Sequence, residues 1–443
     1  MKTVTKFFLL TQFLLSFAGC DSVSDSVIYM ANSPVYMSRE DFNITAKTVE
    51  GQTLKNPGKI CLYGDFLFIN EVGKGIHVID NTNPSSPNNV AFIEITGNID
   101  LAAKDGILYA DNLVDMLLFD ISDPRSPRLK TRMENVFEGV FPAPSNEYPV
   151  VSKIDTSRKV IVGWEQKKVK EEVVFNYPRW YYPEYALNVA SDSRYSWSKN
   201  SLQPGINIIG VNGSMSRFAI TDNCLYAIYI KNVVYNQSPA PSTNYYTTGE
   251  LKVFDLREGG VKQVNSVFVN NTVETLFAYR DYLFMGMSNG MQIYSIANPV
   301  APVYVSSAWH FWGCDPVVVD ENYAYLTVRS TNTCGQNGNL LQVYDIKEIR
   351  QPTLVSQFDM QEPYGLGIDG NKLFICDKGL KVFDATNPRQ VGQKLLFSTT
   401  DFKGYDLIPY NNLLLVIGDN GLYQYSYSSD NQLNRLSVIP VTK

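Results

Sequence analysis

Histidine is nearly missing from this sequence, and so are the short motifs that mark the common enzyme classes. The 443 residues include two histidines, His77 and His310, although histidine is the side chain most often used for general acid–base catalysis. The chain has no Gly-x-Ser-x-Gly elbow, no glycine-rich phosphate loop and no His-Glu-x-x-His. These absences exclude the motif-defined serine hydrolases, phosphate-loop enzymes and zinc proteases.

Cysteine is also scarce, and its spacing excludes a redox motif. None of the six cysteines forms Cys-x-x-Cys, the arrangement of thiol–disulfide oxidoreductases. No set of four ligands has the spacing of a zinc site, and no loop has a recognisable spacing of calcium ligands. We therefore expect neither a metal nor another cofactor.

Basic side chains are fewer than acidic ones. Lysine and arginine together number 38, against 44 aspartate and glutamate residues, and the formal net charge is −6. Nucleic-acid binding needs a basic surface, so we expect no nucleic-acid partner.

Long apolar runs are confined to the N-terminus. Two lysines precede an apolar run at 7–17, and an Ala-Gly pair precedes Cys20. This is the layout of a secretory signal peptide, and the run is too short to span a membrane comfortably. A cysteine directly after the small pair resembles the bacterial lipobox, although Phe17 stands where that pattern has leucine. The resemblance predicts a signal peptide at 1–19 and lipidation of Cys20, with the lipid as the only membrane anchor; a plain secretory peptide is the alternative.

The most prominent feature that is present is a repeat. It consists of an alternating apolar strand, then Asp or Ser, then a turn rich in Asn, Asp, Pro and Ser. The residues that end these strands are Asp80, Asp120, Asp255, Ser295, Asp345, Asp384 and Ser426. Because an aspartate side chain can accept hydrogen bonds from the amides of its own turn, we expect these residues to be structural.

Each repeat also contains a hairpin ahead of that strand. Asp-Gly, Asp-Asn and Asn-Asn pairs separate alternating segments, as in KDGILYADN and YNNLLLVIGD, and such pairs are typical of hairpin turns. With a fourth strand after the turn, each unit has four antiparallel strands at a period of about 40 residues, which is typical of a propeller blade. We count eight units, one of them a degenerate copy at 152–178; seven blades remain if that copy does not form. The sequence predicts an all-β, single β-propeller over residues 57–443, after a tether and lead-in segment at 20–56.

The individual strands resemble the LVIVD repeat. The longer stretches GKICLYGDFLFINEVGKGIHVIDNTNPSSP, NGSMSRF and CDPVVVDENYAYLTVR resemble a family of LVIVD-repeat surface lipoproteins of Bacteroidota, and the likeness spans nearly the whole mature chain. The resemblance implies a propeller that its lipid holds on the outer membrane, at the cell surface. It implies no established biochemical activity.

The long insertions all belong to two kinds of connection. In a four-stranded blade, the loops between the second and third strands and the links between blades lie on one face of the disc. The insertions are of these kinds and occupy 137–148, 177–214, 233–249, 309–315 and 330–338. We name their common side the decorated face. Since long loops on a rigid scaffold commonly carry function, we expect this face to bind a ligand.

Two cysteines fall in insertions of the same blade, Cys314 and Cys334. In an exported protein a disulfide between them is the expected state, with two free thiols as the alternative. Cys61, Cys224 and Cys376 occupy strand positions of the repeat, so we expect them to be buried thiols.

Aromatic residues crowd the same insertions. The candidate ligand-binding residues, one histidine included, are Trp180, Tyr181, Tyr182, Tyr185, Trp197, Tyr245, Tyr246, Trp309, His310 and Trp312. Exposed rings stack on sugars and anchor protein interfaces. The same rings could instead pack the insertions onto the disc.

A second candidate site is the mouth of the central channel. The repeat places polar residues of both signs at the inner ends of first strands or one residue away, among them Lys59, Asp100, Arg217, Asp315 and Asp406. Two carboxylates there could act as acid and base, as in glycosidases. The alternative is a hydrated channel mouth with internal ion pairs.

Together these patterns favour a non-catalytic binding module for a glycan or a protein at the cell surface. Two alternatives stay open. One is a glycan hydrolase or lyase that uses carboxylates at the channel mouth, and the other is a scaffold subunit of an outer-membrane complex. Catalysis is undecided from the sequence, and the missing motifs weigh against it.

Overall fold

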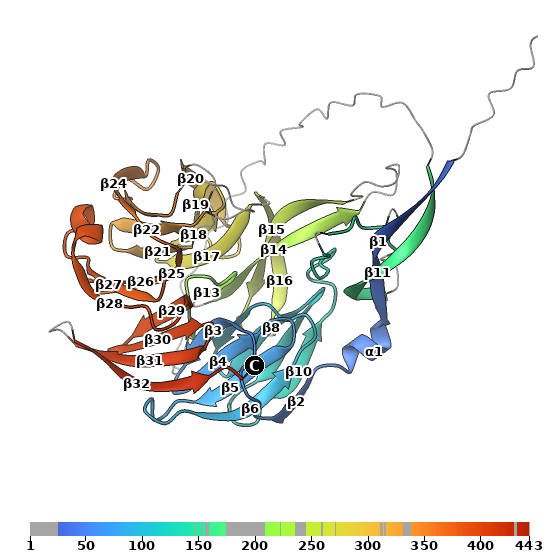
Figure 1. The fold of residues 1–443 in the computed structure, drawn as a ribbon, viewed down its shortest axis with the longest axis horizontal. Coiled ribbons are helices and arrows are strands. Elements are labelled where there is room, and N and C mark those ends of the chain that lie inside the picture. The colour runs from blue at the N-terminus through green and yellow to red at the C-terminus, as the bar shows by residue number, and fades with distance from the viewer. Residues whose placement is uncertain are drawn as a thin grey trace, which may run out of the picture.

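The computed structural model shows a ring of seven four-stranded blades with a two-stranded ribbon beside it (Figure 1). The residues that it describes are 25–145, 147–151, 153–155, 159–173, 209–221, 223–234, 245–257, 260–270, 272–310, 313, 316–330, 338–428 and 432–442. The predicted all-β, single propeller is confirmed, and the count of eight blades is wrong. In the described part of the chain, no helix is both long and apolar enough to cross a membrane.

The first three blades differ in what is added to them. Blade 1 contains β3 (Pro57–Tyr63), β4 (Phe66–Glu71), β5 (Gly75–Asp80) and β6 (Asn88–Glu94). Blade 2 contains β7 (Leu101–Lys104), β8 (Ile107–Asn112), β9 (Asp115–Asp120) and β10 (Arg128–Met133). Blade 3, which follows the longest insertion, contains β13 (Phe218–Ile220), β14 (Cys224–Val234), β15 (Tyr245–Asp255) and β16 (Lys262–Val269). Blade 1 alone gains an extra strand on each edge, so its sheet has six strands.

The last four blades follow one another closely in the chain. Blade 4 contains β17 (Val273–Tyr279), β18 (Tyr282–Met287), β19 (Gly290–Ser295) and β20 (Val303–Trp309). Blade 5 contains β21 (Val317–Asp320), β22 (Tyr323–Val328), β23 (Leu340–Asp345) and β24 (Thr353–Asp359). Blade 6 contains β25 (Pro363–Asp369), β26 (Lys372–Asp377), β27 (Leu380–Asp384), the 3-10 helix η1 (Pro388–Gln393) and β28 (Leu395–Thr399). Blade 7 contains β29 (Gly404–Tyr410), β30 (Leu413–Gly418), β31 (Gly421–Tyr427) and β32 (Leu433–Pro440).

Stacking of the blades explains why their second strands are apolar on both faces. All residues of β4 and of β26 are buried, whereas the outer strand β10 is largely exposed. Each blade packs face to face against its neighbours, so a middle strand is covered from both sides and its sequence becomes a nearly continuous apolar run. The core therefore consists of clusters between blades, each built from two adjacent sheets.

The turns have the local chemistry that the repeat predicts. Asp105-Gly106 joins β7 to β8 with both φ angles positive, at 48° and 75°, as two-residue hairpin turns require. The strand-ending aspartates accept hydrogen bonds from the amide two residues ahead, as Asp120 does from Ser122 at 2.9 Å. The structural role predicted for these aspartates is confirmed at Asp80, Asp120, Asp255, Asp345 and Asp384.

The ring closes by packing of the last blade on the first. The first strands of successive blades contact one another around the ring, and β29 returns to β3. Next to this junction Leu54 and Val441 form a parallel bridge, and both belong to the apolar cluster shared by blades 7 and 1. The inner strands thus surround a central channel, which fixes the positions of the channel-mouth residues.

The predicted eighth unit does not form a blade because its strand pairs elsewhere. β11 (Lys159–Val173) runs antiparallel to β1 (Asp25–Ser38), with Asp25 opposite Val173 and Ser38 opposite Lys159. Local alternation of apolar and polar residues predicts a strand, but it does not name the partner strand. The partner comes from the segment that the sequence suggested as a tether and lead-in.

That lead-in segment is tied to the propeller at two further points. After β1 comes a short helix, α1 (Arg39–Asn43), from which Arg39 donates to both carboxylate oxygens of Asp115 at 2.9 and 2.7 Å. β2 (Lys47–Glu50) then adds to the outer edge of blade 1 beside β6. The ribbon is therefore held beside blade 2 and extends away from the disc (Figure 1).

Candidate functional site

Residues 209–217, which begin in the longest insertion, fill the central channel. It includes β12 (Val211–Asn212), which pairs with Leu62 and Cys61 of β3. Its Gly210 amide donates to Ala103 of β7 at 2.7 Å, and its Ser216 carbonyl accepts from Leu276 of β17 at 2.8 Å. These partners lie on the inner strands of different blades, so the segment passes between them through the channel.

Four of the five predicted channel-mouth residues meet around this segment. Asp406 accepts from the Ser214 hydroxyl at 3.1 Å and from the amides of Met215 and Leu407 at 3.3 and 3.0 Å. Lys59 donates through Nζ to the Met215 carbonyl. Asp315 is not among the described residues.

Asp100 holds the other end of the same segment. It accepts from the Leu101 amide at 2.7 Å, from the Ser216 hydroxyl at 3.1 Å and from the Arg217 amide. Asp100 and Asp406 are each only 2% exposed. Both carboxylates are therefore covered and engaged with the backbone, a geometry that suits holding the segment rather than acting on a substrate.

The electrostatics follow from this burial. Desolvation raises the pKa of Asp406 to about 6 and also raises the pKa of Asp100, while the Lys59 ammonium acts in the opposite direction on both. Burial likewise lowers the pKa of Lys59, which the charge of Asp100 partly offsets. The cluster is an internal polar network of mixed charge, in which the carboxylates of Asp100 and Asp406 lie near the ammonium of Lys59 and the guanidinium of Arg217.

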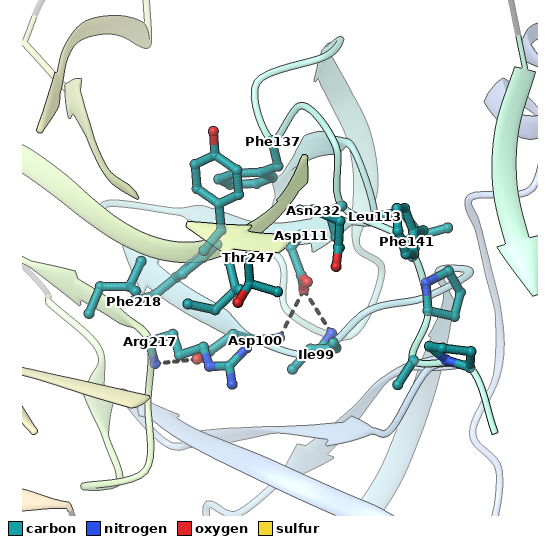
Figure 2. A pocket seen from close by; sticks show the side chains of 17 residues that line it. Ile99, Asp100, Asp111, Leu113, Phe137, Phe141, Arg217, Phe218, Asn232 and Thr247 are labelled. Atoms are coloured by element: carbon teal, nitrogen blue, oxygen red, sulfur yellow. Dashed lines mark hydrogen bonds between the residues drawn. The ribbon is translucent and has the colours of Figure 1, made fainter. Parts of the chain in front are cut away.

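The decorated face also carries a cavity of about 330 Å³ between blades 2 and 3, which shares Asp100 and Arg217 with the channel cluster. Its lining comes from the link before β7, the β8–β9 turn, the segment after β10 and the strands β13, β14 and β15 (Figure 2). The labelled residues in the figure are Ile99, Asp100, Asp111, Leu113, Phe137, Phe141, Arg217, Phe218, Asn232 and Thr247. Apolar side chains line one side of the cavity, which we call the apolar wall. Carboxylates and a guanidinium line the opposite side, which we call the polar floor.

The apolar wall is built by a phenylalanine cluster. The ring of Phe137 lies 6.2 Å from that of Phe218, 5.4 Å from that of Tyr229 and 6.4 Å from that of Phe254. All four belong to one buried cluster between blades 2 and 3. Since each ring is packed by its neighbours, this wall is preformed.

The segment after β10 is fixed to the ribbon. The Phe141 ring packs edge-on against Trp164 of β11 at 5.4 Å between centroids, and the Trp164 indole donates to the Pro142 carbonyl at 2.6 Å. The ribbon therefore supports the part of the cavity wall that includes Pro142.

The polar floor centres on Asp111. Its Oδ1 accepts from the Asn98 side chain at 2.7 Å and from the amides of Ile99 and Asp100 at 2.8 Å each. Its Oδ2 accepts no hydrogen bond from the described part of the chain, and Asp111 lines the cavity (Figure 2). Desolvation raises the pKa of Asp111 to about 7, so this carboxyl changes its charge near neutral pH.

Two more polar groups face the same floor. Asn232 donates its side-chain amide to the Gly139 carbonyl at 3.1 Å, which fixes its orientation. Arg217 donates through Nε to the Glu274 carbonyl at 3.4 Å and carries positive charge beside Asp100. The floor can thus offer a carboxyl oxygen, an amide and a guanidinium to a polar ligand.

The predicted aromatic residues are placed only in part. Trp309 ends β20 and is 57% exposed, and the His310 amide donates to the Asn289 carbonyl at 3.2 Å. Tyr245 and Tyr246 belong to β15, opposite Val234 and Val233, so strands extend into the insertion predicted at 233–249. Trp180, Tyr181, Tyr182, Tyr185, Trp197 and Trp312 lie outside the described residues, as do Cys20, Cys314 and Cys334.

The cavity between blades 2 and 3 is not directly indicated by any sequence motif. The insertion at 137–148 was identified, but its phenylalanines resemble any apolar loop residues. Asp111 lies near the end of the second strand of its blade, where other blades also carry polar residues. The one available indication was FEGVFPAPS, a stretch too apolar for an exposed loop.

The remaining histidine and the strand cysteines are structural. His77 is buried, with Nε2 at 2.9 Å from a Glu71 oxygen, and burial lowers its pKa. Cys61, Cys224 and Cys376 are buried free thiols, which confirms that prediction. No group of three or more potential metal ligands occurs among the described residues.

The comparisons with known proteins agree with the fold. Residues 57–92 match the model of the LVIVD repeat. The chain is a β-propeller with a match to the LVIVD repeat in its first blade. No curated protein sequence matches it.

The similar solved structures share the architecture at very low identity. The periplasmic gluconolactonase PpgL of Pseudomonas aeruginosa has a TM-score of 0.50 at 10% identity, over 87% of this chain and 98% of that chain. Sqt1 of Saccharomyces cerevisiae has a TM-score of 0.46 at 9% identity, over 91% and 87%. BamB of Moraxella catarrhalis has a TM-score of 0.43 at 8% identity, over 90% and 97%. At such identities the likeness extends to the fold alone.

Proposed function

We propose that this β-propeller is a non-catalytic binding module whose ligand is a glycan, with one sugar unit seated in the cavity between blades 2 and 3. The observation that carries the proposal is the composition of that cavity. An apolar wall at Phe137 and Phe218 faces a polar floor at Asp111, Asn232 and Arg217. A sugar ring has the same division, with a C–H face and an edge of hydroxyl groups.

The size and position of the cavity support this proposal. A volume of about 330 Å³ lies at the lower end of small-ligand sites and suits a single ring better than a long chain. The site opens on the decorated face, where exposed Trp309 and the aromatic insertions could hold further sugar units.

A binding role is favoured over the hydrolase or lyase alternative. Asp100 and Asp406, the carboxylates on which that alternative depended, are buried and hydrogen-bonded to the segment that fills the channel. A general acid must come within hydrogen-bond reach of the substrate. The segment covers Asp406, and although Asp100 lines the cavity, both of its oxygens already accept hydrogen bonds from Leu101, Ser216 and Arg217.

The cellular setting is part of the proposal. Lipidation of Cys20 would hold the mature chain on the outer membrane, at the cell surface, as in the surface lipoproteins of Bacteroidota that the sequence resembles. A disulfide between Cys314 and Cys334 suits an exported protein. The decorated face would then be available to glycans outside the cell.

The test is binding of the chain from residue 21 onward to a broad panel of polysaccharides and host glycans. We expect a specific ligand whose affinity falls at least about tenfold in Asp111→Asn, which keeps the shape but replaces the free Oδ2 by a donor. Asp120→Asn, on the opposite face of blade 2, is the matched control and should bind normally.

Other outcomes redirect or overturn the proposal. A ligand that is lost in Trp309→Ala but retained in Asp111→Asn would place the site in the aromatic insertions instead. If no glycan in the panel binds, a glycan ligand is contradicted. Crosslinking on whole cells would then test for a protein partner or a scaffold role.

A further inference from the structure

The β1–β11 ribbon has one covered face and one open face near its free end. Tyr29, Ala31 and Val169 lie on the covered face, in the apolar cluster that packs the ribbon on the segment after blade 2. Side chains alternate between faces along a strand, so Ile28 and Met30 point the other way. Their exposed fractions are 57% and 39%.

Two lysines stand directly beside these apolar side chains. Lys170 is the ladder partner of Ile28, and Lys168 is the ladder partner of Met30. Both lysines are exposed, and neither forms an ion pair with any residue that the structure describes. Lys167, on the covered side of the register, pairs with Glu165 instead.

We propose that Ile28, Met30, Lys168 and Lys170 form a face that docks on a bilayer surface with anionic headgroups. Apolar side chains flanked by lysines suit this interface, since the apolar groups enter the headgroup boundary and the ammonium groups reach the anionic lipids.

The place of the ribbon in the chain supports a lipid surface over a protein partner. β1 begins at Asp25, five residues after Cys20 and eight after the apolar run at 7–17 ends. Few residues therefore separate the ribbon from the predicted anchor, and its free end projects away from the disc (Figure 1). Docking of this face would set how the propeller stands on the membrane.

The test uses the chain from residue 21 onward, which retains every described element, including the ring closure at Leu54 and Val441. We expect it to co-sediment with vesicles of phosphatidylcholine and phosphatidylglycerol better than with pure phosphatidylcholine, and less at high salt. Lys168→Glu should weaken this binding at least about fivefold. Lys167→Glu makes the same charge change on the neighbouring position of the opposite face and should bind nearly as wild type.

A second measurement tests the apolar part of the face. Met30→Trp should show a blue-shifted emission component and quenching by brominated phospholipids on binding to the anionic vesicles, relative to the unsubstituted chain. Equal effects of Lys168→Glu and Lys167→Glu, no preference for anionic vesicles, or an unquenched Trp at position 30 would each overturn the proposal. Glycan binding at the cavity does not enter this assay, so the two proposals fail separately.

Discussion

The hydroxyl of Ser214 donates a hydrogen bond of 3.1 Å to the carboxylate of Asp406, a residue 192 positions later in the chain. The same hydroxyl accepts from the Leu366 amide at 2.9 Å. One serine from an insertion thus joins the first strands of blades 6 and 7. Together with Asp100, which holds Ser216 and Arg217, this contact makes the channel-filling segment part of the core.

Removal of the Asp406 carboxylate should therefore destabilise the whole ring. In Asp406→Ala the buried donors at Ser214, Met215 and Leu407 lose their acceptor, and we expect a loss of about 3 kcal/mol in the free energy of unfolding. Urea denaturation followed by tryptophan fluorescence measures it. The control is Asp80→Ala, a half-buried turn aspartate at the rim of blade 1, for which we expect about 1 kcal/mol. Equal losses in the two variants would contradict a core role for the segment.

The glycines at or just before the start of the third strands should be intolerant of any side chain. Gly379 has a φ of 127°, and a Cβ there would overlap the Thr399 carbonyl oxygen of the neighbouring strand. We expect Gly379→Ala to cost several times more stability than Gly64→Ala. Gly64 also has positive φ, at 57°, but no heavy atom lies within 4 Å of its built Cβ, so only the backbone cost of about 1 kcal/mol applies. Thermal unfolding of the two variants side by side tests the difference.

The raised pKa of Asp111 predicts a loss of stability with rising pH. Its pKa is about 7 in the folded chain, against 3.8 for an unperturbed aspartate. Between about pH 4 and pH 7 the unfolded chain loses this proton first, so the unfolded state gains and the contribution of Asp111 to folding stability falls. Asp111→Asn is neutral at every pH and keeps an oxygen at the Oδ1 position. The variant should become more stable relative to wild type across this interval.

The measurement is urea unfolding of both proteins at pH values from 4 to 8. The contributions of Asp100 and Asp406, whose pKa values are also raised, occur in both proteins and largely cancel in the difference. A difference that stays constant with pH would show that Asp111 titrates at its ordinary value.

The proposed disulfide has a direct chemical test. Peptide mapping of the exported protein without reduction should recover Cys314 linked to Cys334, while Cys61, Cys224 and Cys376 remain free because they are buried. A Cys314→Ser variant should lose about 3 kcal/mol of stability, as expected for a closed loop of this length. Two alkylatable thiols at these positions in the native protein would contradict the proposal.

Local features of the fold could be predicted from the sequence, and long-range pairings could not. The Asp105-Gly106 turn and the hydrogen bonds of Asp80 and Asp120 depend on neighbours within a few residues, so the repeat revealed them. The segment around β11 pairs with β1, more than 120 residues earlier in the chain, and therefore does not form a blade. Its alternating pattern fits a blade and a ribbon equally well, which is why eight blades were predicted and seven formed.

The candidate sites, too, could be predicted from the sequence only in part. The repeat register placed Lys59, Asp100, Arg217 and Asp406 near one another, because equivalent positions of successive blades must meet at the channel. The occupant of that channel was not predictable, since residues 209–216 belong to no repeat. The cavity between blades 2 and 3 also needed the tertiary structure, because Asp111 of β8, Phe137 of the segment after β10 and Asn232 of β14 come from separate parts of the chain.

The sequence by itself determined the blade, its turns and the propeller, since each of these follows from apolar periodicity and from turn residues that act over a few positions. Only the tertiary structure decided the number of blades, the filling of the channel and the open face of the ribbon. These depend on contacts between segments far apart in the chain, and such contacts are selected by the packing of the whole ring, which no local pattern encodes.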